Sequence, residues 1–215
     1  MNDEIIIEVN EVSKKYDDAT VLDNVSLEIE KGKIYGLVGR NGSGKTVLMK
    51  CICGLIKPTS GEVKVAGKTV GKDVDIPEDI GVIIETPGFI PNYSGFKNLK
   101  LLASVRNKIS NEEIRKSMKI VGLEPKSRKH VGKYSLGMRQ KLGIAQAIME
   151  KPKILILDEP MNGLDNESVA VVRKILKEQA ENGATIILAS HNREDIDVLC
   201  DKVYTMDHGV IECER

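Results

Sequence analysis

Hydrophobic positions in the first third of the chain fall in short β-branched runs rather than at helical spacing. Glycine, aspartate, asparagine and proline separate most of these runs, and these residues favour turns. The pattern predicts five strands, over Ile5–Val9, Val25–Ile29, Ile34–Val38, Glu62–Val65 and Ile80–Ile84. We therefore expect the front of the molecule to be rich in β-structure.

The apolar spacing becomes helical in the middle of the chain. One helix is predicted over Asn98–Val105 and another over Asn111–Val121, where the apolar side chains of the second helix share one face. A third helical pattern follows through Leu142 and Ala145 to Met149. The middle of the chain is therefore predicted to form a helical lobe.

Strands and helices alternate in the last third. Two nearly continuous apolar runs, Ile154–Leu157 and Thr185–Ala189, flank a helical stretch at Glu167–Glu181. Buried parallel strands have this composition, and a strand–helix–strand order implies a right-handed crossover. A helix and a hairpin are predicted to follow, over Glu194–Leu199, Lys202–Met206 and Val210–Glu212.

The charge balance bears on possible partners. The chain has 215 residues, with 32 Lys plus Arg against 32 Asp plus Glu. This balance provides no bulk positive field for a polyanion. Trp is absent and only two Phe occur, so stacking platforms for single-stranded nucleic acid are scarce. We expect no nucleic-acid partner.

The amino terminus and the cysteines indicate the compartment. The start is acidic and its apolar run covers only Ile5–Ile7, which fits neither a signal peptide nor a membrane span, so a cytoplasmic protein is predicted. Cys51, Cys53, Cys200 and Cys213 lack the paired spacing of a zinc site. Buried or unreactive thiols are the expected reading.

A glycine-rich segment carries the strongest chemical signal. GRNGSGKT occupies Gly39–Thr46, directly after the apolar run Ile34–Val38 and before a predicted helix start at Val47. It matches the phosphate-binding pattern G-x-x-x-x-G-K-[ST] in the strand–loop–helix context that the pattern requires. The segment predicts a nucleoside triphosphate site, and a plain turn is the weaker alternative.

Individual residues of this segment have distinct expected roles. The backbone N–H groups of Gly42, Ser43 and Gly44 can surround phosphate oxygens at the positive end of the following helix. Lys45 is predicted to reach the β and γ phosphates, and Thr46 is predicted to bind Mg²⁺.

Acidic and histidine side chains follow two of the predicted strands. Asp158 and Glu159 end the run Ile154–Leu157, and His191 comes just after the next strand. Ligands gather at the carboxyl ends of such strands. Asp158 is therefore the predicted metal partner, Glu159 the general base and His191 a γ-phosphate contact. Alone, each would more often be a solvated or structural residue; their coexistence with Lys45 favours a catalytic site.

The order of these motifs resembles the nucleotide-binding subunit of an ATP-binding cassette (ABC) transporter over nearly the whole chain. The resemblance implies an α/β fold with a P-loop NTPase core of mixed sheet and helices, an antiparallel β subdomain and a helical lobe. Residues 1–87 and 151–215 would form the sheets, and residues 88–150 the lobe. The motifs that carry it are Gly39–Thr46, Tyr134–Gln140, Asp158–Glu159, Gly163–Asp165 and Ser190–His191.

The resemblance also implies a role for several residues. Tyr16 would stack on adenine, although an isolated Tyr is more often a packing residue. Ser135 and Gly137 would face the nucleotide of a partner subunit. ATP would then hold a head-to-tail dimer together, and hydrolysis would separate the two subunits. Ser135 is also expected to cap its own helix. Asp165 would couple the two sites and cap the next helix. The implied ATP-binding set is Tyr16, Gly39, Asn41, Gly42, Ser43, Gly44, Lys45, Thr46, Val47, Ser135 and Gly137; the metal set is Thr46, Glu85 and Asp158; the catalytic set is Lys45, Glu159 and His191.

Three positions depart from the common family pattern. Leu136 and Met138 stand where the signature usually has Gly and Gln, and Glu85 stands where a Gln usually touches Mg²⁺ and senses the membrane subunit. A carboxylate would bind Mg²⁺ more strongly and yet repel the γ-phosphate.

The departures also point to a subgroup. The run Ile84–Asn92, together with Tyr134–Met138, resembles ATP-binding subunits of bacterial exporters that confer resistance to bacitracin and lantibiotic peptides. The resemblance implies an ATPase that uses ATP and Mg²⁺ and powers efflux through a separate integral membrane permease. It would work at the inner face of the cell membrane, docking through the segment after Glu85.

Two other functions are compatible with parts of the sequence. The first is a soluble ABC ATPase acting on nucleic acid or ribosomes, but such proteins generally have two cassettes or a long coiled-coil insertion. The second is a nucleotide-gated binding module that barely hydrolyses ATP, which Glu85 and the altered signature make conceivable.

Overall fold

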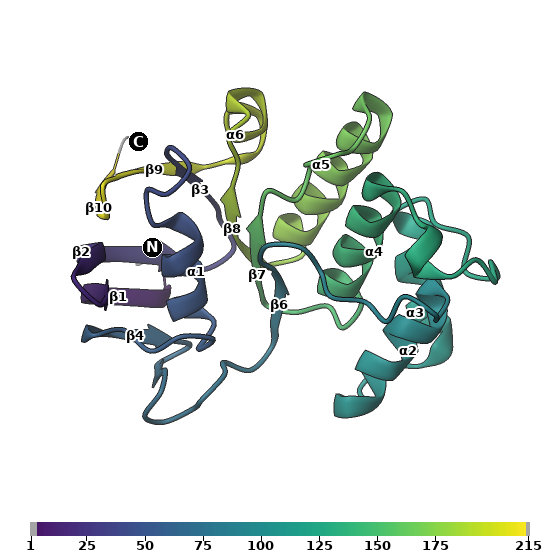
Figure 1. The fold of residues 1–215 in the computed structure, drawn as a ribbon, viewed down its shortest axis with the longest axis horizontal. Helices are drawn as coiled ribbons and strands as arrows, with labels where there is room; N and C mark the ends of the chain where they lie inside the picture. The colour runs from purple at the N-terminus through teal and green to yellow at the C-terminus, as the bar shows by residue number, and fades with distance from the viewer. Residues whose placement is uncertain (1–3, 214–215) are drawn as a thin grey trace.

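Two β-sheets and the helices around them form the described part of the chain, residues 4–213 of a computed structural model (Figure 1). The smaller sheet is antiparallel, in the order β2-β1-β4-β5. Its strands are β1 (Ile5–Tyr16), β2 (Ala19–Glu30), β4 (Ser60–Val65) and β5 (Lys68–Thr69). The sheet and the three helices α2–α4 lie at opposite ends of the molecule, with β6, β7 and β8 between them.

The larger sheet has the order β10-β9-β3-β8-β7-β6 and is parallel except for β10. Its strands are β3 (Ile34–Val38), β6 (Ile80–Ile83), β7 (Ile154–Asp158), β8 (Thr185–Ala189), β9 (Lys202–Asp207) and β10 (Val210–Cys213). Because β3, β8, β7 and β6 are parallel neighbours, the loops that follow them emerge at one edge of the sheet. The motifs predicted from sequence at three of these strand ends therefore meet there.

Polar side chains set where most helices begin. Ser94, Ser110, Ser135, Asp165 and Asn192 each accept a hydrogen bond from a backbone N–H in the first turn of the helix that follows. The helices are α1 (Lys45–Ile52), α2 (Gly95–Arg106), α3 (Asn111–Ile120), α4 (Leu136–Ile148), α5 (Asn166–Glu181) and α6 (Arg193–Leu199), with a 3₁₀ turn at Val131–Lys133.

The largest difference from the sequence prediction concerns β1 and β2. Both strands have 12 residues, whereas the apolar runs predicted only Ile5–Val9 and Val25–Ile29. The two strands pair along their whole length with several register shifts, and many of their remaining residues are polar and exposed. The pattern of buried apolar side chains therefore predicts only part of these two strands. Backbone pairing between β1 and β2 continues through the remaining residues.

Alternate residues of β7 and β8 face two hydrophobic clusters. Leu157 and Leu188 pack in the cluster that contains buried residues of α2, α3, α4 and α5. Ile156 and Ile187 belong to the other cluster, with β1, β2 and α1. This division follows from the two-residue period of a strand. The α2–α4 segment therefore shares its hydrophobic core with the central sheet.

Close approach of α4 to the sheet depends on a glycine. A Cβ on Gly81 of β6 would lie 2.0 Å from the carbonyl oxygen of Ala147. Similarly, a Cβ on Gly143 of α4 would lie 2.7 Å from Cγ of Pro87. These contacts fix α4 beside the loop that leaves β6.

Two further sequence expectations bear on the thiols and the membrane. Cys51 and Cys53 are buried, and burial raises their pKa to about 11 and about 12. Within residues 4–213, no group of three or more His, Cys, Asp and Glu side chains is placed to bind a metal. None of the helices in this range is long and apolar enough to cross a bilayer.

Candidate functional site

The loop between β3 and α1 depends on glycines. Gly39, Gly42 and Gly44 have φ of +157°, +81° and +110°, values that residues with an L side chain rarely adopt. A Cβ on Gly39 would stand 2.1 Å from the carbonyl oxygen of Met206. A Cβ on Gly44 would stand 2.8 Å from that of Val21. The loop is thus confined on one side while its other side lines a cavity.

Lys45 lies under this loop with only 7% of its surface exposed. Its ammonium group donates hydrogen bonds to the carbonyl oxygens of Gly39 at 2.7 Å and Arg40 at 2.9 Å. Burial lowers the pKa of Lys45, and attraction from Asp158 and Glu159 opposes that shift. A buried ammonium with further donor capacity suits a phosphate group.

Two features of the loop fit a bound anion. The Ser43 hydroxyl is buried and has no hydrogen-bond partner among residues 4–213. Helix α1 begins after Gly44 without a side-chain cap, so its first N–H groups have no side-chain acceptor. Oxygen acceptors from phosphate would satisfy both. The structure therefore fits the phosphate group predicted from the sequence.

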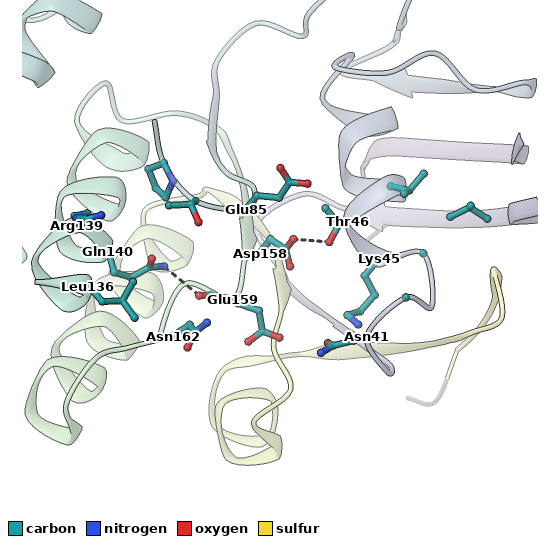
Figure 2. A pocket seen from close by; sticks show the side chains of 16 residues that line it. Asn41, Lys45, Thr46, Glu85, Leu136, Arg139, Gln140, Asp158, Glu159 and Asn162 are labelled. Carbon is teal, nitrogen blue, oxygen red and sulfur yellow. Dashed lines mark hydrogen bonds between the residues drawn. The ribbon is translucent and has the colours of Figure 1, made fainter. Parts of the chain in front are cut away.

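Thr46 joins the loop to the end of β7. Its hydroxyl donates a 2.7 Å hydrogen bond to Oδ2 of Asp158 (Figure 2). Hydroxyl and carboxylate oxygens are ligands that Mg²⁺ accepts in nucleotide sites. Glu85, the third predicted metal ligand, lines the same cavity, but its carboxylate forms an ion pair with Lys50 at 2.6 Å. The Thr46 hydroxyl and the Asp158 carboxylate fit a Mg²⁺ ion whose other ligands would come from nucleotide phosphates and water.

Glu159 follows Asp158 at the edge of the sheet. Its φ of +50° is left-handed, and its backbone N–H donates to the carbonyl of Ala189 at 2.9 Å. Nδ1 of His191 lies 2.7 Å from Oε2 of Glu159. The prediction that the ends of β7 and β8 meet is therefore confirmed, although His191 is 70% exposed and does not itself line the cavity.

The cavity at this edge has a volume of about 460 Å³, within the usual range for small-molecule sites. Nine residues predicted for the site line it: Asn41, Gly42, Gly44, Lys45, Thr46, Val47, Glu85, Asp158 and Glu159. Gly39 and Ser43 belong to the same loop without lining the cavity, and His191 reaches it through Glu159.

Three further predicted residues do not line the cavity of this chain. Ser135 and Gly137 flank Leu136, which does line it, and Ser135 caps α4 by accepting a hydrogen bond from the N–H of Met138. Tyr16 ends β1 with 47% of its surface exposed, and the Lys14 ammonium lies 5.0 Å from its ring centre. Their predicted nucleotide contacts remain predictions.

Sequence reasoning missed Gln140 and Asn162 as cavity residues. Gln140 is 8% exposed, and its amide donates to the carbonyl oxygen of Glu159 at 3.2 Å, as Figure 2 shows. The same amide donates to the carbonyl oxygen of Pro160 at 2.9 Å. Gln140 follows Leu136 by one helical turn, so both project from the same face of α4. The spacing relates Gln140 to Leu136, which the sequence did not place at the cavity either.

The amino-acid sequence was compared with known proteins. Residues 22–162 match the family described as ABC transporter. The chain belongs to the ABC transporter family. It is an ATP-binding subunit of this family and uses ATP and Mg²⁺.

Relatives with assigned names support this membership. The chain is 48% identical to the uncharacterized ABC transporter ATP-binding protein YybJ of Bacillus subtilis (strain 168), covering 96% of this chain and 95% of the relative. It is 43% identical to the bacitracin transport ATP-binding protein BcrA of Enterococcus faecalis, over 96% of this chain and 68% of BcrA. It is 36% identical to the lantibiotic transport ATP-binding protein SrtF of Streptococcus pyogenes, over 98% and 90% of the two chains.

Solved structures confirm the predicted fold class. An ATP-binding subunit of an ABC transporter superposes with a TM-score of 0.86 at 27% identity, covering 97% of this chain and 90% of the other. A dimeric ATP-binding cassette in a post-hydrolysis state with ADP and Pi gives a TM-score of 0.87 at 23% identity, covering 98% and 99%. The ABC-type core predicted from the sequence is therefore confirmed.

Proposed function

We propose that this chain is the ATP-hydrolysing subunit of an exporter that removes an antimicrobial peptide or drug from the cell. A separate integral membrane permease would carry the substrate, and the chain would bind that permease from the cytoplasmic face of the membrane. The names of BcrA and SrtF support this substrate class. The observation that carries the hydrolytic part is the meeting of Lys45, Asp158, Glu159 and His191 at one edge of the sheet.

Each residue at this edge of the sheet has a separate role in ATP hydrolysis. Lys45 would bind the terminal phosphates, and Thr46 and Asp158 would hold a Mg²⁺ ion, which would neutralise phosphate charge. Glu159 takes a proton from a water molecule, whose oxygen bonds to the γ-phosphorus while the bond from phosphorus to the β–γ bridging oxygen breaks. The products are ADP and inorganic phosphate. His191 orients the Glu159 carboxylate through their 2.7 Å contact.

A head-to-tail dimer would complete the site. Ser135 is exposed at the beginning of α4, where the helix N-terminus favours an anion. It does not line the cavity of its own chain, and neither does Gly137. Both are therefore available to the nucleotide of a second subunit. In this arrangement ATP joins the two subunits, and hydrolysis releases them.

The helical lobe, about residues 88–150, would dock on the permease. The loop after Glu85 leads from β6 to α2, and α2 exposes Leu101, Leu102 and Val105, with Val105 82% exposed. Exposed apolar groups along one helix favour a protein contact. Action on nucleic acid or ribosomes receives no support from the relatives reported above, which are named for transport or left uncharacterised.

The decisive experiment uses Glu159→Gln in the complex of chain and permease. We expect turnover to fall at least about 100-fold, because positioned proton transfer contributes about 10²–10⁴-fold. ATP affinity should stay within a few-fold of wild type, and the nucleotide-bound dimer should accumulate in size-exclusion chromatography. Glu167→Gln, an exposed glutamate in the first turn of α5, is the matched control.

Two results would contradict the proposal. Hydrolysis by Glu159→Gln at the wild-type rate would reject Glu159 as the base. The exporter assignment fails if cells that produce the chain with its permease show the same sensitivity to bacitracin and to lantibiotic peptides as cells that lack both.

A further inference from the structure

An ion pair links helix α1 to the end of β6. Nζ of Lys50 lies 2.6 Å from Oε1 of Glu85. The Lys50 side chain is 26% exposed and that of Glu85 64%. Lys50 comes four residues after Thr46, so both project from the same face of α1. One helix face therefore makes two polar contacts with the edge of the sheet, Thr46 with Asp158 and Lys50 with Glu85.

The register of the sheet places Glu85 beside the catalytic acids. Ile83 of β6 is paired with Leu157 of β7 in a parallel arrangement. Glu85 is two residues beyond Ile83, as Glu159 is two residues beyond Leu157, so an acidic residue follows this paired position by the same number of residues in each chain segment. Figure 2 shows Glu85 on the same side of the cavity as Asp158 and Thr46.

The cavity consequently contains more negative than positive protein charge. Glu85, Asp158 and Glu159 line it, against the cations Lys45 and Arg139. A triphosphate is itself a polyanion, and a carboxylate near its terminal phosphate repels it unless that carboxylate is compensated. Lys50 pairs with Glu85 without lining the cavity, and it therefore supplies the compensating charge from outside the lining.

We propose that Lys50 is a positioning residue of the nucleotide site. It neutralises Glu85 and holds its carboxylate beside Thr46 and Asp158, so that the acidic end of β6 tolerates the γ-phosphate. The inference rests on ATP binding in the proposed function, and it is independent of which compound is exported. A solvent-exposed ion pair with no role at the site would contribute little to nucleotide binding or to the stability of the fold.

The test compares Lys50→Met, Glu85→Gln and the double variant in the full chain. Affinities for fluorescent ATP and ADP analogues are measured in EDTA, which separates charge compensation from Mg²⁺ binding. We expect Lys50→Met to weaken ATP binding about tenfold and ADP binding less than about threefold, because the γ-phosphate adds charge near Glu85. The double variant should return to within about twofold of wild-type ATP affinity, since the uncompensated carboxylate is gone.

Lys64→Met is the matched control. Lys64 forms an ion pair of comparable exposure with Glu62 at 3.0 Å, on the antiparallel sheet away from the cavity. Its nucleotide affinities should equal those of wild type. The melting temperature of nucleotide-free Lys50→Met should also equal that of wild type within about 2 °C, because an exposed pair contributes little stability.

Wild-type ATP affinity in Lys50→Met would overturn the inference, and so would a double variant that binds ATP as weakly as Lys50→Met. Equal weakening for ATP and ADP would also overturn it, because the effect would then not concern the γ-phosphate. A wild-type chain that binds ATP but supports no export contradicts the exporter assignment alone. A wild-type chain that binds no ATP contradicts both.

Discussion

Asp195 on α6 should be among the most costly side chains to remove outside the cavity. It is 2% exposed, and its Oδ1 accepts hydrogen bonds from Nε and Nη2 of Arg173 at 2.8 and 2.6 Å. Oδ2 accepts a 3.2 Å hydrogen bond from the hydroxyl of Ser190, which immediately precedes His191. Asp195→Ala would leave a mostly buried guanidinium without its main partner.

The magnitude follows from this burial. Removing one partner of a buried ion pair costs about 3–5 kcal/mol, because the other charge stays buried and uncompensated. Glu194 still binds the same guanidinium at 2.8 Å, so we expect the lower end, about 3 kcal/mol. At about 2.1 cal/mol/K per residue, a chain of 215 residues has an unfolding entropy of about 450 cal/mol/K. The expected fall in melting temperature is about 7 °C.

Differential scanning calorimetry and urea unfolding of the purified nucleotide-free chain measure this loss. Glu194→Ala is the control, since it removes the exposed partner of the same Arg173 and should cost less than about 1 kcal/mol. A fall of less than 2 °C in Asp195→Ala, or equal falls in the two variants, would refute the reasoning that burial decides the contribution.

Two predictions concern ionisation. At pH 8, iodoacetamide should modify the exposed Cys213. Burial raises the pKa of Cys53 to about 12, so Cys53 should stay protonated and unmodified until the chain unfolds. Mass spectrometry of the digested protein measures labelling at both sites, and labelling of Cys53 before unfolding would contradict this prediction. Hydrogen bonds from two lysines, Lys202 foremost, lower the pKa of Glu30 from 4.5 to about 2, so its stabilising effect is fully present above about pH 4.5 and is lost as the pH falls toward 2. The difference in melting temperature between wild type and Glu30→Gln should therefore shrink between pH 6 and pH 2.5, and a difference that grows would contradict this sign.

The sequence predicted the central sheet well because its strands are apolar on both faces. The runs Ile34–Val38, Ile154–Leu157 and Thr185–Ala189 match β3, β7 and β8 within one residue. Helix α2 begins earlier than its apolar spacing indicated, because the Ser94 side chain caps it. Strand β1 extends past Val9 to Tyr16 through mostly polar residues, among which only Val12 is buried.

The candidate site was predictable as far as it depends on strand ends. The phosphate loop and the acids after β7 are local motifs, and the order of parallel strands brings them together. The contributions of Gln140 and Leu136 were not predicted, because they depend on where α4 packs against the loop after Glu159. The contact between His191 and Glu159 likewise requires coordinates, since the sequence indicated only that the two lie at neighbouring strand ends.

The left-handed backbone at the ends of β6 and β7 has a consequence for protein engineering. Glu85 and Glu159 have φ of +57° and +50°, a region that disfavours residues other than glycine by about 1–2 kcal/mol each. A redesign that ranks substitutions by folding energy would introduce glycine or asparagine at both positions. The resulting protein would tolerate heat better and would have lost two acids that face the cavity. Thermostabilising libraries for this chain should therefore keep both positions fixed.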